Sequence, residues 1–186
     1  PEPRPMIRFR NRLFAAVFVL PLPLLASIQQ APITLAEVDD PLLHAEIAQL
    51  GLYPEIEGGF SEAVLLNVPL RSCSSVHAEL GGEGVTVRFT ARPNVTHVEL
   101  ATLQVIQDDS LLFIPKDAYV GLRDPRFCGF DDGLQLMLPY CNASRSADGF
   151  RTYVHLQLGE GRRTRLVTWV FDDGRYLFRL DENVVL

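Results

Sequence analysis

One segment of the sequence, Cys73-Ser-Ser-Val-His77, places a nucleophile near a base. A cysteine becomes nucleophilic when a neighbouring histidine or a helix N-terminus lowers the pKa of its thiol. On an extended strand, however, residues four apart are separated by about 13 Å. A catalytic dyad therefore requires a turn between Cys73 and His77, and without one we expect His77 to face solvent.

Two further histidines, His97 and His155, fall on predicted strands and could meet across a sheet. With Cys73, they are the candidates for a catalytic site of dispersed residues. The sequence has no G-x-S-x-G elbow, P-loop, G-x-G-x-x-G or H-E-x-x-H motif, which argues against the common hydrolase, nucleotide-binding and metalloprotease classes. The cysteines and histidines also lack zinc-ligand spacing. We therefore expect no metal and no cofactor.

Three cysteines are present, and an exported protein would tend to pair two of them. We predict a disulfide between Cys128 and Cys141, because they bracket a predicted turn and strand. Closing that loop would contribute about 3 kcal/mol of stability in the chain-entropy model. Cys73 would then be a small buried side chain. Pairings through Cys73 stay possible, because sequence does not fix connectivity.

Charged residues cluster in short runs. Paired aspartates recur at positions 39–40, 108–109, 131–132 and 172–173, which is typical of tight turns. The alternative is a calcium site, with Asp131 and Asp132 as the best candidates, although calcium needs six or more oxygens. The run Arg162-Arg163-x-Arg165 lies at a predicted hairpin tip. It could clamp a carboxylate or phosphate of a partner, or it could be a solvated turn.

The N-terminal residues predict export. Three arginines precede the uncharged run from Leu13 to Leu25, and small residues follow it. This pattern indicates a secretory signal peptide, too short to span a bilayer. We therefore assign residues 1–30 to an upstream extension plus signal peptide, and residues 31–186 to a single β domain. The processed protein would have no stable membrane span and would be secreted or periplasmic.

The elements that position these residues follow from hydrophobic periodicity. Asp39-Asp40-Pro41 predicts the start of one short helix that Gly51 ends. Alternation then predicts a hairpin around Gly81–Gly84, and a long strand to Gln107 with a bulge near Ala101. A meander of three strands closes the chain, with Trp169 in its core. The fold class is mainly β, an antiparallel sandwich or barrel of about eight or nine strands with one short N-terminal helix.

The least regular stretch, residues 115–129, is the expected binding loop, because long connections in β scaffolds often carry binding sites. The acidic net charge of −6 argues against nucleic acid and favours a basic protein partner. The predicted binding residues are Lys116, Asp117, Tyr119, Arg123, Arg126, Asp131 and Asp132.

These features favour an exported, non-enzymatic protein that binds another macromolecule in the periplasm or extracellular space. An inhibitor, an immunity-type protein or an envelope accessory factor would fit. Two alternatives stay open. One is a small secreted hydrolase or lyase with dispersed catalytic residues. The other is a carbohydrate- or lipid-binding β-barrel, which would need a large apolar cavity.

Overall fold

The computed structural model describes residues 31–49 and 65–183. The predicted signal peptide and the end of the predicted helix at Leu50 and Gly51 lie outside the described residues. Within the described part of the chain, no helix is both long enough and apolar enough to cross a bilayer.

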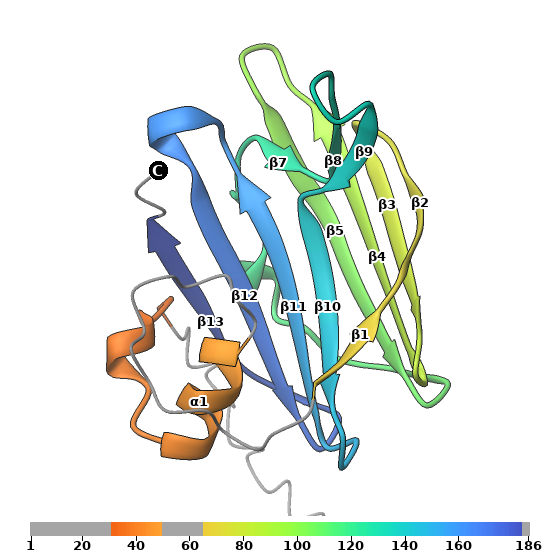
Figure 1. Cartoon of the computed structure of the whole chain (residues 1–186). Helices are drawn as coiled ribbons and strands as arrows, with labels where there is room; N and C mark the ends of the chain where they lie inside the picture. Colours follow the sequence, from red (N-terminus) through yellow and green to blue (C-terminus); the bar gives the residue numbers. More distant parts are fainter. Residues whose placement is uncertain (1–30, 50–64, 184–186) are drawn as a thin grey trace, which may run out of the picture.

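Two antiparallel sheets face each other and form a sandwich (Figure 1). Sheet A has the strand order β1 (Leu65–Val68), β10 (Cys141–Ser146), β11 (Arg151–Leu158), β12 (Arg165–Asp172) and β13 (Arg175–Asn183), with β7 (Pro125–Arg126) paired to β11. Sheet B has the order β2 (Leu70–Cys73), β3 (His77–Gly82), β4 (Val85–Pro93), β5 (Val98–Gln107) and β6 (Ser110–Leu111). A separate two-stranded hairpin contains β8 (Cys128–Asp131) and β9 (Leu136–Pro139).

The mainly β, antiparallel prediction is confirmed, and the architecture is the sandwich rather than the closed barrel. The described chain has thirteen strands instead of eight or nine. The difference arises from short strands such as β6 and β7, which have two residues each and too few positions to show alternation. The C-terminal meander of β11, β12 and β13 is present as predicted.

The predicted hairpin joins β3 to β4, but its turn is shorter than expected. Gly81 and Gly82 pair with β4, so the turn consists of Glu83 and Gly84, both with positive φ. Between β4 and β5 the register shifts beside Ala101, because Thr90 pairs with Thr102 and the next residue of β4 pairs with Leu100. The predicted bulge is therefore confirmed.

The main core fills the space between the sheets. Phe89 of sheet B stacks on Phe127, with ring centroids 5.7 Å apart, and also contacts Trp169 of β12. All three side chains are buried. The indole Nε1 of Trp169 donates to the carbonyl of Ala118, 2.8 Å away, in the short helix η2 (Lys116–Ala118). The prediction that Trp169 lies in the core is confirmed.

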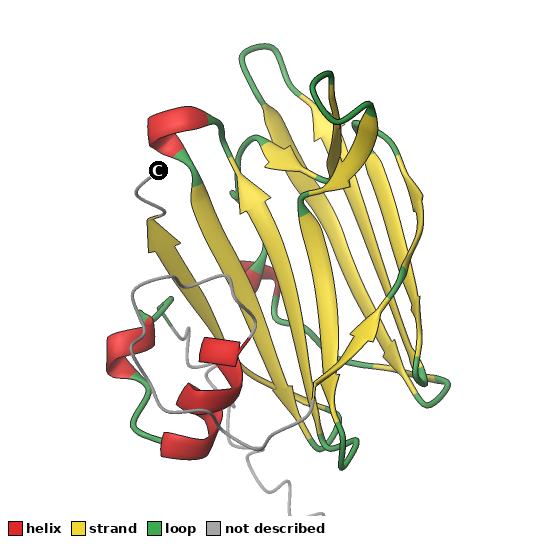
Figure 2. Cartoon of the chain, in the orientation of Figure 1, coloured by secondary structure: helices red, strands yellow, loops and turns green. Residues whose placement is uncertain are grey.

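A helical layer covers the other side of sheet A (Figure 2). It contains η1 (Leu35–Glu37) and α1 (Pro41–Gln49). Of the two aspartates that predicted the start of the helix, Asp40 caps α1, since its Oδ1 accepts hydrogen bonds from the amides of residues 42 and 43. Leu43 and Ile47 of α1 then pack against Tyr153 and Val170 of the sheet. A second, smaller core thus joins the helix to the sandwich.

A buried charge network reinforces this contact. Glu46 of α1 is 3% exposed and lies beside Arg151, whose Nε is 2.9 Å from its Oε2. The hydroxyl of Tyr153 donates to the same carboxylate oxygen. Burial, followed by this hydrogen bond to Glu46, raises the pKa of Tyr153 well above its usual range. The helix therefore docks through one ion pair and one phenol in addition to apolar contacts.

Candidate functional site

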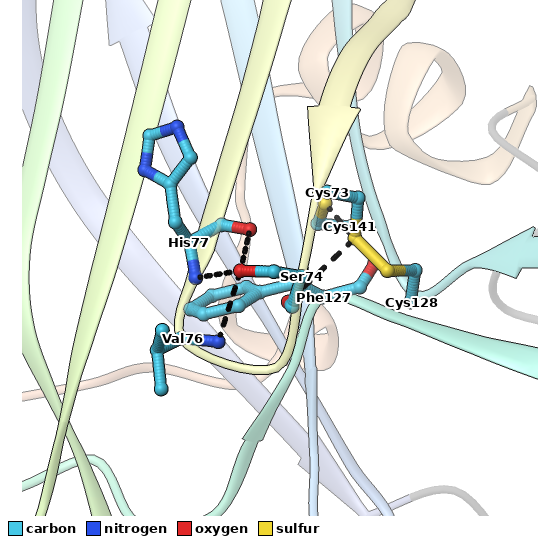
Figure 3. Close-up of a disulfide and its surroundings, with 7 residues drawn as sticks. All are labelled: Cys73, Ser74, Val76, His77, Phe127, Cys128 and Cys141. Carbon is cyan, nitrogen blue, oxygen red and sulfur yellow. Dashed lines mark hydrogen bonds between the residues drawn. A yellow bond between two sulfur atoms is a disulfide. The ribbon is translucent and has the colours of Figure 1, made fainter.

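The disulfide joins Cys73 to Cys128, so the predicted pairing of Cys128 with Cys141 is wrong (Figure 3). Cys73 ends β2 at the edge of sheet B, and Cys128 begins β8. The fold brings together two elements that are 55 residues apart, whereas the prediction relied on the local loop between positions 128 and 141. Cys141 is instead the buried free thiol, and its Sγ–H donates to the carbonyl of Phe127, 3.4 Å away.

The disulfide also excludes the proposed dyad of Cys73 and His77, because Cys73 has no thiol to activate. A turn does separate the two residues. The hydroxyl of Ser74 stabilises it by accepting hydrogen bonds from the amides of Val76 and His77. The His77 ring points away from the disulfide (Figure 3). The Cys73-Ser-Ser-Val-His77 segment is therefore a structural turn that ends at a cross-link.

Of the other two catalytic candidates, His155 lies on a strand of sheet A, whereas His97 lies in the connection between β4 and β5 and not on a strand as predicted. His97 precedes β5 of sheet B, and its Nε2 is 2.6 Å from Oε1 of Glu99. His155 lies in β11 of sheet A on the same face as Tyr153, which points away from sheet B. Its Nδ1 is 2.8 Å from the hydroxyl of Thr168, and burial lowers the pKa of His155 to about 3. The structure does not bring the two histidines together.

The β8–β9 hairpin carries the largest concentration of exposed apolar side chains in the described chain. Phe130, Leu134, Leu136 and Met137 are between 55% and 61% exposed. Phe130 and Met137 are cross-strand partners and therefore share one face of the hairpin. We name this set of four side chains the apolar hairpin surface.

Three contacts at its base fix the hairpin to the sandwich. The disulfide ties the first residue of β8 to β2. The guanidinium of Arg126 stacks on the ring of Tyr140, 3.9 Å from its centroid. The backbone of Gly129 packs so closely on that ring that a Cβ there would lie 2.8 Å from it. An isolated two-stranded hairpin is marginally stable in water, so these contacts hold the apolar hairpin surface in place.

A cleft of about 800 Å³ lies beside the hairpin, and Cys128 and Gly129 of β8 form part of its wall. Its charged lining contains four arginines and two carboxylates, namely Arg123, Arg126, Arg163, Arg165, Asp124 and Glu160. The cleft is therefore locally positive in a chain with a net charge of −6. We name it the arginine cleft.

The four arginines differ in their partners. Arg165 binds the carboxylate of Asp181 through two nitrogens, and Arg126 forms a 3.4 Å ion pair with Glu160. Arg123 and Arg163 are exposed, and neither forms an ion pair with any residue that the structure describes. Arg163 ends the short helix η3 (Gly161–Arg163). Two guanidinium groups of the cleft therefore keep their donors available for a ligand.

The predicted binding residues divide into three groups. Arg123 and Arg126 line the arginine cleft. Asp131 and Asp132 lie at the hairpin turn, where Oδ1 of Asp131 accepts from the amide of Leu134. The remaining three, Lys116, Asp117 and Tyr119, lie at or beside η2 and do not line the cleft. The described residues include no group of three or more His, Cys, Asp or Glu side chains arranged to hold a metal.

The sequence did not predict this site as a whole. The run Arg162-Arg163-x-Arg165 was considered as a possible clamp for a carboxylate or phosphate, and it supplies Arg163 and Arg165 to the cleft. The apolar hairpin surface gave no signal, since alternating leucines predict a strand with one face in the core.

Comparison with known proteins finds no matching family model, no matching curated protein and no matching solved structure.

Proposed function

We propose that this protein is a non-enzymatic binding protein that recognises another protein through the apolar hairpin surface. One observation carries the proposal, namely that the exposed side chains of Phe130, Leu134, Leu136 and Met137 lie on a hairpin that a disulfide holds in place. Exposed apolar side chains gathered on one element of a stable domain mark interaction sites, and here Phe130 and Met137 share one face of the hairpin. Phenylalanine and methionine are also enriched at the centres of protein interfaces.

The surroundings of the hairpin support binding rather than catalysis. Polar groups of Asp131, Asp132 and Gln135 lie at its turn, which gives an apolar centre a polar rim. The residues considered for catalysis, in contrast, are oxidised in the case of Cys73 and buried in the case of His155. An exported location is part of the proposal. The disulfide is compatible with it, because disulfides persist in oxidising compartments.

Site-specific photocrosslinking tests the proposal. A benzophenone amino acid replaces Met137 in one variant and Phe113 in a second variant, which serves as the control. Phe113 is 81% exposed, follows β6 and belongs to neither the hairpin nor the cleft. We expect the probe at position 137 to capture a defined second protein in the native compartment. The probe at position 113 should not capture that protein.

A second substitution shows whether the apolar surface causes the crosslink. Phe130→Ser in the position 137 variant should abolish the crosslink while leaving the fold intact, because Phe130 shares a face of the hairpin with position 137 and is more than half exposed. Capture of the same proteins from both positions would contradict the proposal. Capture of only a second copy of this chain would also contradict it and would assign the hairpin to self-association.

A further inference from the structure

We infer that the arginine cleft binds a carboxylate-bearing segment of the partner protein. This inference rests on the proposed function and names the chemistry of the partner next to the hairpin. Arg123 and Arg163 line the cleft without an ion-pair partner in the described chain. A guanidinium group offers a planar fork of donors that matches the two oxygens of a carboxylate.

Two of the four arginines in the cleft already have partners within the protein, and the other two do not. Asp181 binds Arg165 through two hydrogen bonds, and Glu160 and the ring of Tyr140 hold Arg126. These contacts fix the side of the cleft nearest the hairpin and the sheet. Arg123 approaches from the segment before β7, and Arg163 approaches from η3. A ligand carboxylate would complete the same type of pairing that the protein itself uses at Arg165.

The shape and lining of the cleft favour a peptide segment over a single small anion. Its volume of about 800 Å³ is much larger than one carboxylate needs. The half-buried side chain of Val98 also lines it, so an apolar side chain of the ligand would have a contact beside the arginines. The wall formed by β8 continues into the apolar hairpin surface. One extended partner segment can therefore contact both.

The sign of the local charge opposes that of the whole chain. The net charge of −6 favours a basic partner over most of the surface. The arginine cleft has two more arginines than carboxylates. Ion pairs with these arginines, rather than the net charge of the chain, would therefore select the ligand that binds in the cleft. An acidic segment would thus be attracted at this one place and repelled elsewhere, which would give the contact its orientation.

Calorimetric titration of the folded protein tests the inference. The probe is a capped peptide of alternating glutamate and leucine, and the matched control has glutamine in place of every glutamate. We expect the glutamate peptide to bind and the glutamine peptide not to bind. Arg123→Gln and Arg163→Gln should each weaken binding about ten-fold, as expected for one charged hydrogen-bonding group. Thermal unfolding verifies that each variant is folded.

Arg162→Gln is the control variant, because Arg162 lies in the same turn, carries the same charge and does not line the cleft. It should change binding less than two-fold. Equal weakening by Arg162→Gln and Arg163→Gln would overturn the inference, since it would indicate only a long-range field. Equal binding of the two peptides, or no binding of either, would also overturn it.

Inorganic phosphate separates a peptide site from a general anion site. If phosphate displaces the glutamate peptide at equal concentration, the acidic-peptide assignment is overturned. The two proposals fail separately. A specific crosslink from position 137 without glutamate-peptide binding would retain the proposed function and reject the role of the arginine cleft. Glutamate-peptide binding without that crosslink would retain the acidic-ligand site in the cleft and reject the proposed function of the hairpin.

Discussion

The thiol of Cys141 is buried and donates a hydrogen bond to the carbonyl of Phe127. Burial raises the pKa of Cys141 to about 12. We therefore expect no alkylation of the native protein by iodoacetamide at pH 8, one labelled cysteine after denaturation and three after denaturation with reduction. Intact mass spectrometry measures each count. Labelling of the native protein would contradict the assignment of Cys141 as an inert thiol.

His155 makes the stability depend on pH. Burial lowers the pKa of His155 to about 3 in the folded protein, whereas the unfolded chain has the ordinary value near 6.5. Between these values the unfolded state binds the additional proton. Stability is therefore complete above pH 6.5 and falls as the pH decreases toward 3, by at most about 1.4 kcal/mol per pH unit from this group.

Urea unfolding between pH 4.5 and 7 measures this dependence. His155→Gln removes the titrating group and keeps a polar side chain that can bond to Thr168. The variant is expected to be less stable at pH 7 but to lose less stability on acidification than the wild type. If both proteins show the same slope against pH, the buried neutral histidine is not its source.

At the scale of elements, the docking of α1 depends on Glu46. Glu46→Ala leaves Arg151 and the hydroxyl of Tyr153 without their buried partner. Removing one member of a buried ion pair costs about 3–5 kcal/mol. Glu37→Ala is the control, because it removes the same charge from the same helical layer at an exposed position. Urea denaturation should show a much smaller loss for Glu37→Ala, and equal losses would contradict the docking role of Glu46.

The disulfide stabilises the sandwich and orients the hairpin. Its 55-residue separation predicts a contribution of about 4 kcal/mol in the chain-entropy model. Reduction should lower the stability of the wild type and of Cys141→Ala alike. The double variant Cys73→Ala, Cys128→Ala should be insensitive to reductant. A reductant effect that disappears only in Cys141→Ala would contradict the observed pairing.

Elements were predicted well where several residues repeat one pattern. The meander, the bulge beside Ala101 and the Asp40 cap each depend on neighbours in the chain, and each is confirmed. The Cys73–Cys128 bond and the arginine cleft depend on segments that are distant in sequence. Local sequence patterns contain no information on which distant segments of the chain lie side by side in the fold. Arg123 and Arg163 could therefore be singled out individually but not placed in one site.

At the scale of the whole molecule, the described chain forms three layers that two apolar cores join. The larger core lies between the sheets, and the smaller one lies between sheet A and the helices. Both faces of sheet A are thus covered, which explains why β11 and β12 are buried along most of their length. The two proposed binding surfaces lie at the end of the sandwich that carries β7, β8 and β9 (Figure 1).

The position of β1 has a consequence for the folding pathway. Sheet B is one continuous meander from β2 to β6, whereas β1 pairs with β10 across all of it. Contacts between distant segments form late, because closing a long loop costs more entropy. The transition state for folding should therefore contain β3, β4 and β5, and β1 should join afterwards.

Two matched substitutions, Val68→Ala in β1 and Val87→Ala in β4, test this order by stopped-flow kinetics. Both valines are buried, and each substitution removes the same two methyl groups. Val87→Ala should slow folding, and Val68→Ala should mainly speed unfolding. An equal slowing of folding by both would contradict the order. The lifetime of the native state, in this scheme, depends on a four-residue strand that is the last to pair and the first to separate.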